Sequence, residues 1–311
     1  MTLERSVADS LVILPVPGHG AEDVLVSREG EVYTGTEDGA VWRILDEGAR
    51  LERVGNTGGR PLGLELLPDG RILVCDARRG LLAMSPWSGA VEELTRLVHG
   101  RRLTFCNNAA VAGNGTIFFT DSSRLFGIDQ WKADMVENTC SGRLLRRDVD
   151  GSVSVMVEGL RFANGVALSA DESYVAVAET AGRTVVRRWL TGDQAGQTDH
   201  LVTDLPGYPD NIARGSDGLI WVTIASPTDR VLEALMRGPM LLRHLVWRLP
   251  EMLQPKPKRT ARVMAFDDAG TLRHDRSLDA SSFHMVTGVR EHAGRVWLGS
   301  LVEPAVATFE V

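Results

Sequence analysis

The sequence lacks an apolar run as long as a membrane-spanning helix, and its basic residues are dispersed. Its first apolar stretch, Leu11 to Pro17, is too short for the core of a signal peptide and has no small-residue cleavage site. We therefore expect a cytoplasmic protein. The net charge of −7, with no run of basic residues to neutralise phosphates, also argues against a nucleic-acid partner.

Cysteine is scarce. Cys75, Cys106 and Cys140 are the three in the chain, and none belongs to a C-x-x-C pair. This spacing indicates neither a disulfide framework nor a zinc site, so we expect all three to be small buried hydrophobic residues. The G-x-S-x-G motif of serine hydrolases is also absent, so serine-dependent hydrolysis is not expected.

A repeated unit is present along the chain: a short apolar strand, a turn with Gly or Asp, and a second strand rich in β-branched and aromatic residues. Six copies occur, with turns at Gly30, Gly70, Gly115, Glu172, Gly218 and Gly294. Most copies are followed by a second strand pair, as in GRLLRRDVDGSVSVMVEG from Gly142. The pattern therefore predicts a blade of four antiparallel strands.

Six such blades are expected to close into a ring, because a single blade cannot bury both of its faces. The 311 residues, 43% of them hydrophobic, would then form one domain over residues 1–311. The segment SLVILP at Ser10 to Pro15 precedes the first copy, and AVATFEV ends the last one. We predict an all-β, six-bladed β-propeller in which these two terminal strands share the sixth blade.

One segment departs from the strand pattern. Residues 231–253 carry apolar side chains at helical spacing, with arginines between them. We predict two short helices here, broken at Gly238 and Pro239. Three interpretations stay open: a structural insertion on the rim of the propeller, a lid that shapes a substrate pocket, or a surface for membrane contact.

Polar residues stand at the start of several inner strands, where Val or Ile would be usual. They are Glu22 and Asp23, Asn107 and Asn108, Asn164, and Asp210 with Asn211. Equivalent positions of different blades face one point, the mouth of the axial channel. A ring of carboxylate and amide oxygens, without thiols or a close pair of histidines, is typical of calcium coordination. The alternative is that Asp and Asn merely begin these strands as turn residues.

Six spaced motifs cover nearly the whole chain. They are GAEDV at Gly20, GRPLGLELLPDG at Gly59, GTIFFTDSS at Gly115, FANGVALSADES at Phe162, LPGYPDNIARGSDGLIWV at Leu205 and EHAGRVWLGS at Glu291. Together they resemble the strictosidine-synthase-like proteins, a group that includes adipocyte plasma-membrane-associated protein. More distantly they resemble paraoxonases and the SMP-30, gluconolactonase and diisopropylfluorophosphatase group.

The resemblance implies a calcium ion in the channel, or two. The ligand positions of the calcium hydrolases fall on Glu22, Asn107, Asn164 and Asp210, with Asn211 and Asp23 as candidates for a second ion or for supporting contacts. Two catalytic groups of the wider family are missing here. Gly288 stands where strictosidine synthase has Glu, and Leu62 stands where paraoxonases have His. Strictosidine synthase activity is therefore not expected.

A calcium ion with an open coordination position would polarise a carbonyl oxygen for attack by water. The candidates for proton transfer are Asp210, Asp23 and His284. A hydrophobic pocket is expected from the insertion together with Leu62, Phe105, Phe162 and Tyr208. We predict hydrolysis of lactones or activated esters. The alternative is a non-catalytic propeller, stabilised by calcium, that binds a small ligand or a protein; the sequence does not indicate an oligomeric state.

Overall fold

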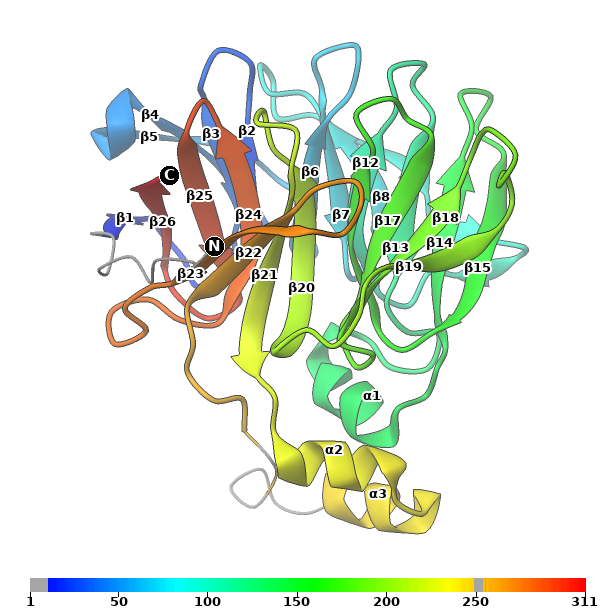
Figure 1. Cartoon of the computed structure of the whole chain (residues 1–311). Coiled ribbons are helices and arrows are strands. Elements are labelled where there is room, and N and C mark those ends of the chain that lie inside the picture. The colour runs from blue at the N-terminus through cyan, green and yellow to red at the C-terminus, as the bar shows by residue number, and fades with distance from the viewer. Residues whose placement is uncertain (1–10, 249–253, 255) are drawn as a thin grey trace.

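The computed structural model describes residues 11–248, 254 and 256–311. Six four-stranded antiparallel sheets are arranged around a central axis, which confirms the predicted six-bladed propeller (Figure 1). Blades 1 to 3 consist of β2 (Val24–Val26), β3 (Val32–Gly35), β4 (Ala40–Leu45) and β5 (Arg50–Asn56); β6 (Pro61–Leu66), β7 (Ile72–Asp76), β8 (Gly80–Met84) and β9 (Val91–Thr95); and β12 (Cys106–Val111), β13 (Ile117–Asp121), β14 (Gly142–Arg147) and β15 (Val153–Leu160).

The second half of the ring repeats the same order. Blades 4 to 6 consist of β16 (Ala163–Leu168), β17 (Tyr174–Glu179), β18 (Thr184–Trp189) and β19 (Thr198–Val202); β20 (Gly207–Arg214), β21 (Ile220–Pro227), β22 (Arg262–Phe266) and β23 (Leu272–Ser277); and β24 (Val286–His292), β25 (Arg295–Ser300), β26 (Ala305–Glu310) and β1 (Val12–Pro15). The first strand of blades 1 to 5, and β24 of blade 6, contact each other around the axis and are called the inner strands.

Blade 6 is built from both ends of the chain. Its outer strand β1 pairs antiparallel with β26, with Val12 opposite Thr308 and Pro15 opposite Ala305. The prediction that the terminal strands share the sixth blade is confirmed. This pairing closes the ring, so each blade has a neighbour on both sides.

The six turns named from the sequence all connect an inner strand to the next strand of its blade. Their five glycines have φ between 80° and 86°, and Glu172 has φ of 56°. Positive φ is strained for residues with a side chain, which explains why glycine recurs at this position.

Six hydrophobic clusters fill the spaces between neighbouring blades. Trp221, for example, is fully buried between blades 5 and 6. Cys75 and Cys106 are buried between blades 2 and 3, as expected. Cys140 is exposed, so the expectation that it is buried was wrong; it lies in the connection between β13 and β14, outside the packed sheets.

The inner strands of alternate blades carry a glycine where the neighbouring backbone comes close. These three glycines lie on β6, β16 and β24, and each faces the polar start of the next inner strand. A Cβ atom would lie 2.6 Å from Asn108 Cα at Gly63, 2.1 Å from Ile212 N at Gly165, and 2.6 Å from Asp23 Cα at Gly288. The glycines of blades 2, 4 and 6 therefore leave space for the polar residues that begin the inner strands of blades 3, 5 and 1.

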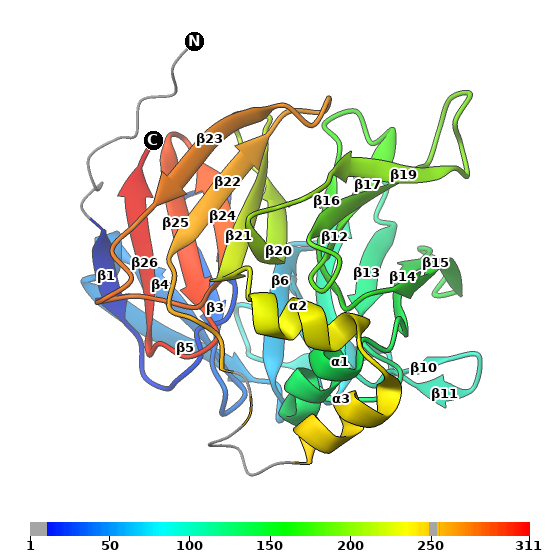
Figure 2. The ribbon, with the colours of Figure 1, turned by 60° about the horizontal axis from the view of Figure 1, so that its bottom comes forward.

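All three α-helices of the described residues gather at one end of the propeller (Figure 2). They are α1 (Trp131–Glu137), between β13 and β14, and α2 (Arg230–Arg237) with α3 (Met240–Trp247), between β21 and β22. The predicted break at Gly238 and Pro239 is confirmed, whereas residues 249–253 of the insertion lie outside the described residues. Two short 3-10 turns, Asp46–Gly48 and Ile128–Gln130, and a small hairpin of β10 (Leu97–Val98) with β11 (Arg101–Arg102) are the remaining elements of the described part of the chain.

The close approach at Gly165 generates a test of the fold. Gly165→Ala should lower the free energy of unfolding by about 3 kcal/mol, because the new Cβ would overlap the backbone of β20 rather than a movable side chain. Urea unfolding measures the change. Gly127→Ala is the matched control, since its Cβ would have an ordinary contact of 3.7 Å and its φ is −82°. Equal stability of the two variants would contradict this packing.

Candidate functional site

The inner strands are interrupted where their polar residues lie. In β12, Cys106 is opposite Asp121 and Ala109 is opposite Phe119, so the strand contains one residue more than its partner. Similar irregularities occur near the start of β6, β16, β20 and β24. Such a bulge breaks the pairing locally and re-aims side chains. It explains how polar residues at the start of a buried strand can point into the central space.

Four oxygen-bearing side chains meet in one pocket at the helical end of the channel. They are Glu22 before β2, Asn107 on β12, Asn164 on β16 and Asp210 on β20. Glu22, Asn107 and Asn164 are almost fully buried, whereas Asp210 is partly open to the pocket. The structure therefore brings together the four residues that the resemblance places on ligand positions, whereas Asn211 and Asp23 do not line the pocket.

The amide groups of this site are oriented by neighbouring hydroxyls. Asn107 donates from Nδ2 to the Ser122 hydroxyl at 2.9 Å, and Asn164 donates to the Thr180 hydroxyl at 3.2 Å. Asn107 Oδ1, Asn164 Oδ1 and Glu22 Oε2 have no hydrogen-bond partner among the described residues. A buried polar atom without a partner costs about 1–3 kcal/mol, so three at one place point to a missing ligand.

The donor set is hard oxygen. Within the described residues, no group of three or more His, Cys, Asp or Glu side chains is placed to hold a metal ion. The pocket instead combines two carboxylates with two amide carbonyl oxygens. This mixture fits a calcium ion better than zinc or copper, which favour nitrogen and sulfur ligands.

Burial raises the pKa of the carboxyl groups at this site. Removal from water raises the pKa of Asp210 to about 7, and nearby Asp23 adds to the shift. Burial, with repulsion from Asp210 and Asp23, also raises the pKa of Glu22 well above its usual value. Arg60 and a hydrogen bond from Asn211 lower the pKa of Glu22, and a hydrogen bond from Asn164 lowers that of Asp210, but burial outweighs them. A bound cation would relieve the remaining cost of the charged forms.

Asn211 and Asp23 support the pocket from outside its lining. Asn211 Nδ2 donates to Glu22 Oε1 at 3.2 Å and so fixes that carboxylate. Asp23 Oδ2 accepts from Leu64 N at 2.9 Å, which links the first two blades. Burial raises the pKa of Asp23 to about 6, while the charge of Arg290 opposes the shift.

His284 lies outside the pocket lining, although the next residue, Met285, belongs to it. Its Nδ1 contacts the Glu303 carboxylate, and its Nε2 is 3.2 Å from Arg259 Nη1. Arg259 can only donate, so Nε2 accepts from it, and Nδ1 donates to Glu303. Both ring nitrogens of His284 are thus bonded to groups other than the four oxygen ligands. This position does not favour His284 as the proton acceptor.

The pocket walls are largely apolar, and the pocket is open to solvent at its mouth. All four residues suggested from the sequence line it: Leu62, Phe105, Phe162 and Tyr208. The sequence did not reveal a second set from the α1 region, namely Ile128, Trp131, Met135 and Val136. The spacing of Trp131 and Met135, one helical turn apart, was the available signal.

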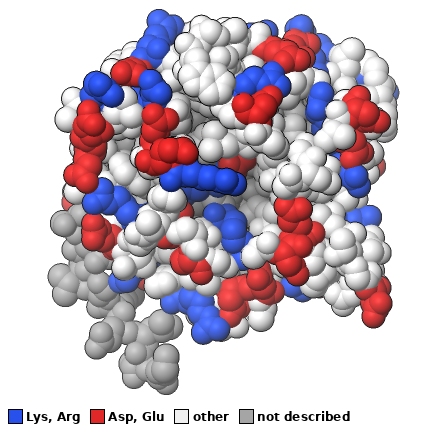
Figure 3. All heavy atoms as spheres, turned by 90° about the horizontal axis from the view of Figure 1, so that it is seen from above, with Lys and Arg blue, Asp and Glu red and all other residues white. Residues whose placement is uncertain are grey.

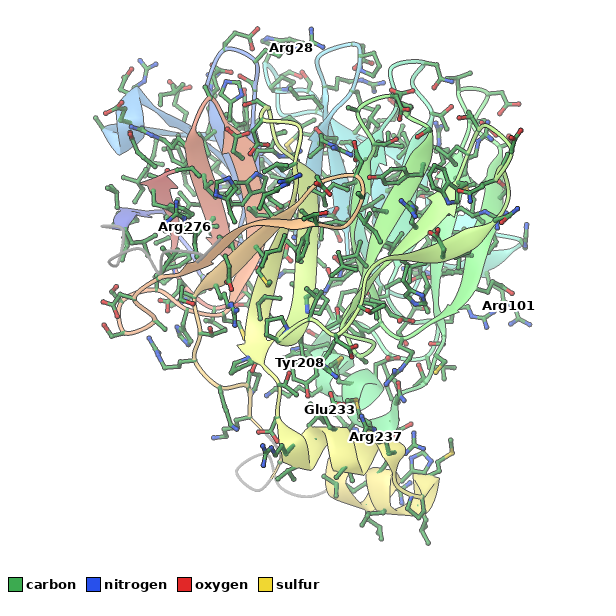
Figure 4. The ribbon with its side chains drawn as sticks, viewed as in Figure 1. Arg28, Arg101, Tyr208, Glu233, Arg237 and Arg276 are labelled. Carbon is green, nitrogen blue, oxygen red and sulfur yellow. The ribbon has the colours of Figure 1, made fainter. Side chains whose placement is uncertain are left out.

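Helix α2 forms the outer part of the wall. Asp229 begins it by accepting hydrogen bonds from Val231 N at 2.8 Å and Leu232 N at 3.1 Å. Tyr208 donates to Glu233 Oε1 at 3.2 Å, which ties the helix to β20 (Figure 4). The insertion therefore contributes directly to the pocket, as one of the three interpretations predicted.

The opposite end of the channel differs from the helical end. Seen from above, it is a shallow hollow surrounded by side chains of both charges (Figure 3). There Arg290 Nη2 lies 3.1 Å from Glu65 Oε2, in a largely buried ion pair between blades 6 and 2. The candidate site is thus at the end of the channel that carries the helices.

Comparison with known families was made on sequence and on fold. The family model for strictosidine synthase matches residues 107–193, and the model for the N-terminal part of strictosidine synthase-like proteins matches residues 9–44. An adipocyte plasma membrane-associated protein from Salmo salar is 33% identical, over 93% of this chain and 77% of its own length. This chain belongs to the strictosidine synthase-like family.

Other members of the strictosidine synthase-like family show the same level of similarity. Strictosidine synthase-like protein 6 of Arabidopsis thaliana is 32% identical over 89% of this chain and 76% of its own length. The fold is shared more widely. A gluconolactonase from Xanthomonas campestris superimposes with a TM-score of 0.71 at 17% identity, covering 96% of this chain and 89% of its own. A calcium-binding regucalcin from Agrobacterium tumefaciens gives 0.65 at 12% identity, covering 95% and 94%.

The expectation of a cytoplasmic location is wrong. It rested on the lack of a long apolar run, but several members of the strictosidine synthase-like family are named for association with the plasma membrane. The reasoning failed because a protein can be held at a membrane without a spanning helix. Within the described residues, no helix has the length and apolar character needed to cross a bilayer.

The raised pKa of Asp210 predicts how stability depends on pH. Its pKa moves from 3.8 in the unfolded chain to about 7 in the fold, so the metal-free folded protein holds a proton that the unfolded chain releases. The folded state therefore loses stability as pH rises from about 4 to about 7. Asp210→Asn removes the charge and should stabilise the metal-free protein by about 2 kcal/mol at pH 8, with little effect at pH 4.

Urea unfolding in the presence of a chelator, followed across this pH range, measures the difference. Asp193→Asn is the control, because Asp193 is exposed on a distant loop. If the free energy of unfolding of Asp210→Asn changed with pH in the same way as that of the wild-type protein, burial would not raise the pKa of the Asp210 carboxyl group.

Proposed function

We propose that this protein is a calcium-dependent hydrolase of hydrophobic lactones or activated esters. The observation that carries the proposal is the set of three buried oxygens without partners, beside the Asp210 carboxylate, at the floor of an apolar pocket. The shared fold with a gluconolactonase adds support, although at 17% identity the likeness concerns architecture alone.

The calcium ligands in this proposal are Glu22, Asn107, Asn164 and Asp210. Each offers at least one oxygen to the pocket, and two carboxylates would balance the charge of the ion. A bound calcium ion supplies Lewis-acid polarisation of a carbonyl oxygen. Asn211 takes the part of a supporting residue, since it donates to Glu22 and fixes the direction of that carboxylate.

The protein's own residues bind the substrate and accept the proton. Leu62, Phe105 and Phe162 hold an apolar ring or chain against the floor and exclude water from around it. Asp210 is the residue we assign as proton acceptor, because it lines the pocket and is partly open to it. Asp23 and His284, the other two candidates, do not line the pocket.

One observation favours the second candidate function, a non-catalytic propeller that binds a small ligand. No histidine belongs to the described lining, and both carboxylates at the floor are also assigned as calcium ligands. A carboxylate that coordinates a metal is a weak base. The two functions share the metal and the pocket, so turnover distinguishes them.

Calcium binding should be detectable from stability alone. A ligand bound by the folded state stabilises it by about 2.7 kcal/mol when its free concentration is a hundred times Kd. Thermal unfolding with added calcium and with chelator measures this shift. Asn164→Ala should abolish it, and Asp193→Ala, far from the pocket, should keep it. A melting temperature that is unaffected by chelator in the wild-type protein would contradict the metal site.

Activity is tested on a panel of γ- and δ-lactones and aryl esters, with calcium or with chelator. We expect calcium-dependent turnover that falls at least about a thousandfold in Asp210→Ala, which loses a ligand and the proton acceptor together. Asp193→Ala is again the control. A calcium-stabilised protein that hydrolyses none of the panel would favour the binding propeller.

A further inference from the structure

Helix α3 exposes an apolar surface that the pocket does not use. Within the described residues, twelve large hydrophobic side chains are exposed, and five of them fall between residues 231 and 245. Four of the five lie on α3 and are called the α3 face: Met240 (58% exposed), Leu241 (71%), Leu242 (48%) and Leu245 (55%); Val231 (71%) lies at the start of α2. Single exposed hydrophobic residues are ordinary, but four on one short helix indicate an interaction surface.

The orientation of α3 is the reverse of that of an ordinary surface helix. Arg243 donates from Nη1 to Glu137 O at 2.6 Å, and His244 Nδ1 lies 2.8 Å from the Glu137 carboxylate. The polar side of α3 is thereby held against α1, and none of the residues of α3 is buried. A helix of a soluble protein usually turns its apolar side inward. Here that side is turned outward and held there.

The charge around the α3 face indicates its partner. Residues 229–262 contain eight arginines and lysines and three acidic residues, in a chain whose net charge is −7. Arg237 and Lys258 are well exposed, with 77% and 60% of their side chains accessible, although Arg237 lies 3.4 Å from Glu233 and Lys258 lies 3.0 Å from Asp229. Both carboxylates are less exposed than their partners, so the basic groups are the outer members of these pairs. Two copies of such a face would bring like charges together, which disfavours a dimer. Apolar side chains flanked by basic ones instead match an anionic lipid surface.

The position of the α3 face suits a flat partner. Helices α2 and α3 project from the end of the molecule, beyond all of the strands (Figures 1 and 2). Arg237 lies at this end, whereas Arg28 marks the opposite one (Figure 4). The opposite end carries acidic and basic side chains interspersed (Figure 3). A plane can thus approach α3 without contacting the blades.

We propose that the α3 face docks on the surface of an anionic lipid bilayer, with α3 lying in the interface. The leucines enter the boundary between headgroups and acyl chains, and the basic residues contact the headgroup phosphates. Leu232 and Lys256, from the two sides of the same insertion, line the pocket, so the pocket mouth opens close to the bilayer. This docking does not depend on the proposed hydrolase activity.

Vesicle cosedimentation tests the docking. The full-length protein should bind vesicles that contain phosphatidylserine and should bind phosphatidylcholine vesicles weakly, with binding reduced by salt. The double variant Leu241→Ser with Leu245→Ser should bind about tenfold more weakly, because two exposed leucines no longer enter the interface. Trp87→Ser with Val149→Ser is the matched control, since both residues are exposed on turns at the other end of the propeller. Arg237→Gln should weaken binding to anionic vesicles alone.

Unchanged melting temperatures of the variants would show that they are folded. The proposal is overturned if the wild-type protein does not bind anionic vesicles, or if the leucine variant binds as well as its control. It is equally overturned if light scattering shows a dimer that the leucine variant dissociates while vesicles stay unbound, because the occupant would then be a second copy.

Discussion

The structure depends on one constraint: six inner strands must meet at an axis while several of them begin with polar residues that have little access to water. Bulges at the start of the strands release these residues from the ladder and turn them toward the central space. Threonines then satisfy the carbonyl groups that the bulges free. Thr120 donates to Asn164 O at 2.7 Å and Thr287 donates to Glu22 O at 2.7 Å, each across two blades. Three of the side-chain oxygens that point into the pocket have no hydrogen-bond partner in the described part of the surrounding protein. These oxygens belong to the candidate site.

Much of this arrangement could be predicted from local sequence, because its causes are local. Turn residues such as Gly30 predicted the hairpins, and polar residues such as Asn107 predicted which positions lie at the axis. Phe162, two residues before Asn164, lines the same pocket, as the sequence also predicted. Other features depend on distant packing. Helix α1 is seven residues long, so the spacing of Trp131 and Met135 was its single signal in the sequence, and both residues line the pocket wall. His284 lies outside the pocket although its neighbour Met285 is inside; the chain adopts a left-handed conformation at Met285, with φ of 52°, just before β24 begins.

The connections between the strands differ at the two ends of the propeller. Short turns at one end need only the conformational freedom of glycine. At the other end, the longer connections of blades 3 and 5 supply α1, α2 and α3, which wall the pocket and form the outermost surface. Because α2 is tied to β20 through Tyr208 and Glu233, the wall and the floor of the pocket are mechanically joined. The insertion is therefore linked to the strand that carries Asp210.

The pairing of β1 with β26 also has a consequence for how the protein acquires its fold during synthesis. Val12 pairs with Thr308, which lies almost 300 residues later in the sequence, so β1 is synthesised long before the strand that pairs with it. Until then it is an unpaired edge, which other chains could add to. Pairing of this edge with another chain is limited by the length of β1, which has four residues, and by its last residue, a proline that has no N–H to donate.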